Sequence, residues 1–183
     1  TIYNWVKWVL TINWWIFERS AEAGINKDNN WWNSYYTVKN LWKITIKWWT
    51  FKNNWAYSSM FANWYYNANE VKAANNNGDT PSVSPTLVID DWLFDGGLNT
   101  VKNDDFGVLT INGWEFINQA QTAFQNHNKA IVNGGLFSPK NNASAIMLWR
   151  FGSSAALSNE WIVEINTGVF EWWISLQDAN KRR

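Results

Sequence analysis

The chain has 183 residues, contains no cysteine, and balances 15 basic against 15 acidic residues, so its formal net charge is zero. A chain of this length can bury a sizeable core without disulfide bonds or a structural metal. The absence of cysteine excludes disulfides, thiolate catalysis and cysteine-ligated metals, and the balanced charge argues against a nucleic-acid partner.

The first 17 residues are strongly apolar, yet they do not match a membrane span. Three polar residues interrupt the run, which is shorter than the ~20 apolar residues that a membrane helix needs. The run also lacks the basic start and cleavage site of a signal peptide. We expect a strand over 1–12 and a short helix from about Trp14, ending at Gly24, and no membrane span.

The next segments predict two strands and a helix. Residues 31–38 suit a strand, and residues 41–51 alternate clearly between apolar and polar positions. Residues 54–74 change to apolar spacings of three and four, which predict an amphipathic helix. An Asn-rich and Pro-containing stretch then breaks regular structure. We therefore divide the chain into two halves of one compact unit, 1–84 and 85–183.

In the second half, strands are expected at 86–94 and 100–111. Asn112 is a suitable N-cap for a helix that continues to Asn133, with Glu115 completing a capping box. A competing interpretation makes Asn112-Gly113 a hairpin turn. Further strands are expected at the positions 136–137, 145–151, 161–165 and 169–176, the last two as a hairpin.

The segment Val9 to Asn13 is repeated without change at Val108 to Asn112, 99 positions later. The match extends beyond this segment to a Trp and a Phe in each copy. A weaker repeat relates the stretch from 159 to 165 to the stretch from 40 to 46. We expect an α+β fold, mainly antiparallel sheet with two or three helices in two related halves; the alternative is an all-β sandwich or jelly roll.

Seventeen Trp residues are too many for one core, so part of them should lie on an interface or a ligand-binding face. Neighbouring residues of a strand point to opposite faces, so each Trp-Trp pair can place one ring in the core and one outside. Such rings suit a subunit interface, and they equally suit stacking on sugars. The candidate interface or ligand residues are Trp15, Trp32, Trp49 and Trp173.

Glu164 and Glu171 are the candidate catalytic residues. If the last two strands formed a tight hairpin, the two carboxylates would lie opposite each other beside Trp173. Two carboxylates on a Trp-lined sheet would suit a retaining glycoside hydrolase. The competing interpretation is a solvated hairpin whose charges discourage edge pairing.

Other polar groups predict no cofactor and no metal site. The acidic residues Asp90, Asp91 and Asp95 have no calcium-loop spacing and fit ordinary turns. His127 is the only histidine and is expected to be structural. Asn142 begins the sequence Asn-Ala-Ser, an acceptor for glycosylation that favours an extracellular or particle-associated location.

These patterns favour a non-enzymatic structural protein, a subunit that assembles with copies of itself into a fibre, shell or coat. The residues shared by the repeated segments are packing and turn residues, with no acid, base or metal ligand among them. The alternative is a carbohydrate-binding module or a retaining glycosidase that uses Glu164 and Glu171.

Overall fold

The computed structural model of the chain describes residues 2–13, 15–19, 36–54, 59–63, 84–90, 92–104, 106–150, 162–171 and 174–178. Within these ranges all nineteen regular elements are strands, and none is a helix. The expected α+β class is therefore wrong. The described residues also contain no helix whose length and apolar character would let it cross a membrane.

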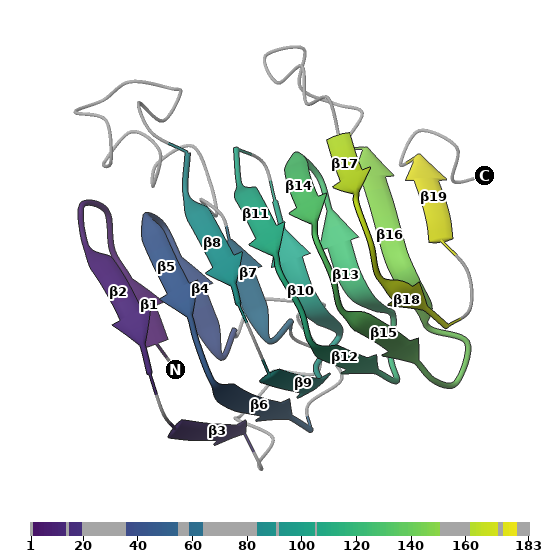
Figure 1. Cartoon of the computed structure of the whole chain (residues 1–183), viewed down its shortest axis with the longest axis horizontal. Coiled ribbons are helices and arrows are strands. Elements are labelled where there is room, and N and C mark those ends of the chain that lie inside the picture. The colour runs from purple at the N-terminus through teal and green to yellow at the C-terminus, as the bar shows by residue number, and fades with distance from the viewer. Residues whose placement is uncertain are drawn as a thin grey trace, which may run out of the picture.

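The strands wind as a solenoid in which each coil of the chain passes through three sheets in turn (Figure 1). Sheet A contains β1 (Ile2–Asn4), β4 (Val38–Asn40), β7 (Phe61–Asn63), β10 (Asn99–Asn103), β13 (Thr122–Asn126), β16 (Ser144–Arg150) and β19 (Ile174–Asp178). Sheet B contains β2 (Val9–Ile12), β5 (Lys43–Ile46), β8 (Thr86–Ile89), β11 (Val108–Ile111), β14 (Lys129–Val132) and β17 (Ile162–Ile165). Sheet C contains β3 (Trp15–Arg19), β6 (Trp49–Asn53), β9 (Trp92–Gly96), β12 (Glu115–Asn118), β15 (Leu136–Pro139) and β18 (Val169–Phe170).

All strand pairs are parallel, and equivalent residues of successive coils stack in register. Val108 pairs with Thr86 of the preceding coil and with Lys129 of the following coil. The expected antiparallel sheet is therefore wrong, and so is the sandwich alternative, although its all-β content is correct. A strand that returns to the same sheet after a full coil arrives in the same direction, which makes every ladder parallel.

The core is a set of side-chain columns that run along the solenoid. Leu87, Ile89, Leu109 and Ile111 belong to the aliphatic columns of sheet B and are fully buried. A column of six Phe rings from sheet C packs beside them, with successive centroids 4.8–5.5 Å apart: Phe17, Phe51, Phe94, Phe116, Phe137 and Phe170. Each coil therefore buries its apolar side chains against the coils on both sides.

The helix expected from Asn112 to Asn133 is wrong, because this segment contains β12, β13 and the start of β14. Its apolar spacing of three and four arises where short alternating strands meet corners, since each corner shifts the alternation. The hairpin alternative at Asn112 is also wrong, because β11 and β12 lie in different sheets. Asn112 Nδ2 donates instead to Asp90 Oδ1, at 2.7 Å.

The two other expected helices fall partly outside the described residues. Residues 15–19 of the first form strand β3, and its remainder lies outside the described ranges. Of the second, the described residues include strand β7. The long strands expected at 41–51 and 86–94 are each two strands of different sheets, separated by a corner.

The repeat that begins at Val9 and Val108 marks equivalent positions in the first and fourth coils. Both residues open a strand of sheet B, and both copies reach a Phe of the stacked column. The offset of 99 residues therefore spans three coils. The division of the chain at residue 84 stays a prediction.

Candidate functional site

The first coil forms one end of the solenoid and exposes an unusual amount of apolar surface. Among the described residues, eleven large apolar side chains are exposed, and nine of them lie on the first coil or on the sixth. The most exposed are Trp15 at 74%, Val9 and Ile16 at 71%, and Trp8 at 64%. We call this surface the first-coil end, made of Tyr3, Trp5, Trp8, Val9, Trp15 and Ile16.

The same end carries the edges of all three sheets. Strands β1, β2 and β3 each stand at the end of their sheet, so one side of each has no strand partner among the described residues (Figure 1). An edge of this kind presents backbone N–H and C=O groups that can pair with another chain. The first-coil end therefore combines apolar side chains with backbone groups ready for pairing.

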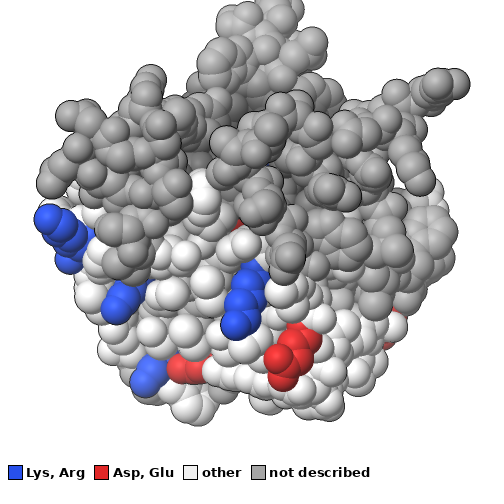
Figure 2. All heavy atoms as spheres, turned by 90° about the horizontal axis from the view of Figure 1, so that it is seen from above, with Lys and Arg blue, Asp and Glu red and all other residues white. Residues whose placement is uncertain are grey.

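Few charged side chains lie on the first-coil end. Residues 2–13 and 15–19 include three charged residues, Lys7, Glu18 and Arg19. Over the described part of the surface in Figure 2, charged side chains form scattered spots of both signs rather than one continuous field.

Glu164 and Glu171 do not form the opposed pair that a hairpin would give. Glu164 lies on β17 of sheet B, where its register partner is Ile131. Glu171 directly follows β18 of sheet C, and its backbone N–H donates to the carbonyl of Phe137. Both residues are exposed. The expected hairpin is wrong because the chain turns a corner between these strands and pairs each with the preceding coil.

Two of the Trp candidates share one column of the solenoid. Trp15 and Trp49 are register partners at the start of β3 and β6, and Trp92 follows in the next coil. The side chain of Trp15 is exposed, whereas the side chain of Trp49 lies outside the described part. Trp32 and Trp173 lie outside the described residues. Further along the same column stand Gly135 and Gly168, both with positive φ.

An interior column of asparagines lines the corner between sheets A and B, and the sequence interpretation missed it. Asn63 Nδ2 donates to Asn103 Oδ1 at 2.8 Å, and Asn103 Nδ2 donates to Asn126 Oδ1 at 2.8 Å. Asn103 Nδ2 also reaches the carbonyls of Gly107 and Lys129. The signal was an Asn two residues after an apolar residue in one coil after another, at positions 4, 40, 63, 103 and 126.

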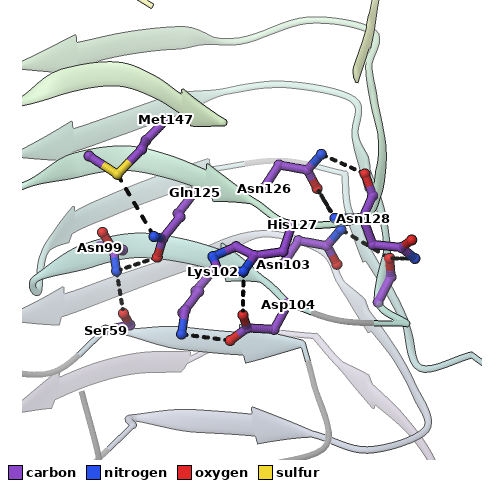
Figure 3. A network of polar contacts seen from close by, with 11 residues as sticks. Ser59, Asn99, Lys102, Asn103, Asp104, Gln125, Asn126, His127, Asn128 and Met147 are labelled. Carbon is purple, nitrogen blue, oxygen red and sulfur yellow. Dashed lines mark hydrogen bonds and ion pairs between the residues drawn. The ribbon is translucent and has the colours of Figure 1, made fainter. Parts of the chain in front are cut away.

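Beside this column lies a buried cluster of three titratable groups (Figure 3). Lys102 Nζ lies 2.7 Å from Asp104 Oδ2, and His127 Nδ1 lies 3.1 Å from Asp104 Oδ1. Burial lowers the pKa of His127 to about 4, Asp104 opposes this shift, and Lys102 adds to it. His127 is therefore neutral near pH 7. The side chains are almost wholly enclosed, so the cluster fits a structural role better than contact with a substrate.

A second polar group of Figure 3 lies along sheet A. Asn99 Nδ2 donates to Ser59 Oγ at 3.0 Å and to Gln125 Oε1 at 2.9 Å. Gln125 Nε2 lies 3.8 Å from Met147 Sδ. These side chains are buried and bond to one another across successive coils. They tie the coils together, and their enclosure leaves no surface for a ligand.

A small polar cavity of about 260 Å³ lies at the corner between sheets C and A. Its lining includes the carboxylate of Asp95 and the amides of Asn53 and Gln119. None of its described lining residues is aromatic, so these residues do not provide the platform on which sugars stack. No cluster of His, Asp and Glu side chains that could hold a metal ion is found within the described ranges.

The comparisons with known proteins add no relative from which a function could be transferred. No protein-family model, no curated protein and no solved structure matches the chain.

Proposed function

We propose that this chain is a non-enzymatic structural subunit that associates with copies of itself through the first-coil end. The observation that carries the proposal is the joint exposure, at one end of the solenoid, of Trp8, Trp15 and Ile16 and of the edges of three parallel sheets. Burial of the apolar side chains supplies free energy of association, and pairing of the strand edges fixes the relative orientation of the copies.

The magnitudes are comparable with the cost of association. Burial of one fully exposed large apolar side chain contributes about 1.5–3 kcal/mol, and the six members of the first-coil end are 40–74% exposed, so their burial contributes at most roughly 5–11 kcal/mol in total. Association of two bodies costs about 4–15 kcal/mol in lost freedom of motion. Pairing of edge backbone groups adds further hydrogen bonds, each with a net contribution of about 1 kcal/mol.

The glycosidase or carbohydrate-binding alternative has weaker support. Glu164 lies on β17 of sheet B and Glu171 follows β18 of sheet C, and neither lines the polar cavity. The exposed Trp15 and Trp114 rings remain compatible with sugar stacking. Binding of soluble oligosaccharides by the Trp114→Ala variant at the level of the parent protein would count against that use of Trp114.

The proposal is tested by the concentration dependence of the molar mass. Sedimentation equilibrium of the purified chain should show reversible association at micromolar concentration, and Trp15→Ser should weaken it at least tenfold. Trp114→Ser is the matched control, because Trp114 is also exposed and precedes a strand of sheet C but lies in the fourth coil. A parent protein that stays monomeric at about 100 μM would refute the proposal, because a dissociation constant above that concentration is too weak to hold an assembly together.

A further inference from the structure

A largely exposed column of polar side chains runs along the corner between sheets B and C. Its members directly follow strands β8, β11, β14 and β17, and they are Asp90, Asn112, Asn133 and Asn166. Asn112 Nδ2 donates to Asp90 Oδ1 at 2.7 Å. Asn133 Nδ2 donates to Asn112 Oδ1, and Asn166 Nδ2 donates to Asn133 Oδ1, both at 2.8 Å. We call this column the amide ladder.

Asp90 fixes the direction of the amide ladder. A carboxylate only accepts hydrogen bonds, so the Asn112 amide must turn its nitrogen towards Asp90 and its oxygen towards Asn133. Asn133 must then present its nitrogen to that oxygen, and Asn166 follows in the same order. Every side-chain donor of the ladder therefore points towards Asp90. Exchange of the Asn112 nitrogen for an oxygen would leave two acceptors facing each other.

Asn112 and Asn133 are each followed by a glycine, and this sequence favours attack of the backbone on the side-chain amide. The nucleophile is the backbone nitrogen of the glycine, which carries no side chain that would hinder closure of a ring onto Cγ. Within the described ranges, neither Gly113 nor Gly134 donates its backbone N–H to a hydrogen bond. Both nitrogens are therefore available for this reaction.

The reaction removes the side-chain amide as ammonia. The glycine nitrogen loses its proton and forms a bond to Cγ of the Asn, and the bond between Cγ and Nδ2 breaks. Ammonia leaves with that proton. Water then opens the five-membered imide at either of its carbonyls, which leaves an aspartate or an isoaspartate at the position.

The surroundings of the two glycines differ. A Cβ on Gly134 would lie 2.7 Å from the carbonyl oxygen of Asn112, so this part of the backbone packs tightly on the preceding coil. Among the described residues, the nearest atom to a Cβ on Gly113 is the carbonyl oxygen of Asp90, at an ordinary contact distance of 3.8 Å. Ring closure needs the backbone to rotate until the glycine nitrogen reaches Cγ, and Gly113 has more room for this movement.

We propose that Asn112 is a site of spontaneous deamidation, and that its conversion breaks the amide ladder at Asp90. The new carboxylate at position 112 faces Asp90 where the bond of 2.7 Å now lies, and like charges in facing positions repel each other. The bond from Asn133 is kept, because a carboxylate still accepts it. The site lies in the fourth coil, so the proposal is independent of self-association through the first-coil end.

Peptide mapping by tandem mass spectrometry tests the assignment on the full chain, held at mildly basic pH and sampled with time. Position 112 should gain about 1 Da at least tenfold faster than Asn166, which belongs to the same ladder but is followed by Thr167. Mapping by residue keeps conversion at the Asn-Gly sequence of 77–78, which lies outside the described residues, separate. Conversion at Asn133 ahead of Asn112, or equal rates at 112 and 166, would overturn the proposal.

Gly113→Ala is the matched variant, because the described surroundings leave space for the added Cβ. It should slow conversion at Asn112 at least tenfold and leave the midpoint of thermal unfolding unchanged. An unchanged rate of conversion would show that the nitrogen of residue 113 is not the nucleophile, which would also overturn the proposal.

The break in the ladder is tested with the reaction product. Asn112→Asp should lower the midpoint of thermal unfolding by about 2–4 °C. Addition of Asp90→Asn should restore it, because an amide at position 90 can donate to the new carboxylate. An Asn112→Asp variant as stable as the parent, or one that Asp90→Asn does not restore, would overturn the proposed break.

Discussion

The rings of Phe94 and Phe116 lie almost parallel, with centroids 5.1 Å apart and an angle of 6° between their planes. Phe94 is fully buried and stacks on a second ring on its other side, that of Phe51, at 5.5 Å. Parallel register produces this geometry, because it places the same residue of each coil directly over the last. The six Phe rings therefore form one continuous column between sheet C and the rest of the core.

Removal of one ring from the middle of this column should strongly destabilise the protein. Phe94→Ala should lower the free energy of unfolding by about 3–5 kcal/mol, since it leaves a cavity between two rings. Phe170→Ala is the matched control, because Phe170 is the last ring of the column and is only partly buried. Urea denaturation measures both. Equal losses for the two variants would contradict the proposed continuity of the column.

Loss of a buried amide contact in the interior asparagine column should cost more stability than loss of an exposed amide contact at the surface. Asn103→Leu removes the donor to Asn126 Oδ1 and the acceptor for Asn63 Nδ2 inside the protein, so a loss of roughly 3 kcal/mol or more is expected. Asn133→Ala breaks a similar amide contact at the surface, to Asn112 Oδ1, and should cost less than about 1 kcal/mol. Thermal unfolding of the two variants makes the comparison, and a larger loss for Asn133→Ala would refute it.

Stability should fall on acidification because of His127. Burial lowers its pKa from 6.5 to about 4, so between these values the unfolded chain binds a proton that the folded chain does not. The contribution is fully present above pH 6.5 and is lost as the pH falls towards 4, by up to roughly 3 kcal/mol. The His127→Gln variant should lose this part of the pH dependence. Urea titrations from pH 4 to 7.5 measure the difference, and identical slopes for both proteins would contradict the prediction.

Trp48 is expected to occupy a position better suited to glycine. Its φ is +64°, a left-handed conformation that costs a residue with a Cβ about 1–2 kcal/mol. Glycine adopts this conformation without that cost. Trp48→Gly should therefore be more stable than Trp48→Ala by about 1 kcal/mol in thermal unfolding. An Ala variant more stable than the Gly variant would show that this backbone strain is unimportant.

Local features of the fold could be predicted from the sequence, but its long-range pairing could not. The alternation around Ile44 and Ile46 indicated a strand with these residues in the core, and both are buried. The repeat beginning at Val9 identified equivalent positions of two coils. However, the spacing of apolar residues after Asn112 suited a helix as well as two short strands joined by corners, so the local pattern could not decide between them.

The candidate site shows the same limit. The sequence predicts that one ring of each Trp-Trp pair points outward; Trp15 is exposed, its neighbour at 14 lies outside the described residues, and the role of Trp15 stays a prediction. The pairing of Glu164 with Glu171 was inferred from an assumed hairpin. Each strand instead pairs with a strand of the preceding coil, and the local spacing of residues does not reveal such a partner.

Because β11 and β14 pair in regular register, one whole coil can be removed without shifting the pairing of the coils that remain. Lys129 occupies the place in sheet B that Val108 occupies one coil earlier. Excision of residues 108–128 would therefore join Gly107 to a residue already in register, and would shorten the molecule by one strand spacing of about 4.8 Å. The length of the solenoid can therefore be changed in steps of one coil, while the first and last strands of each sheet stay unchanged.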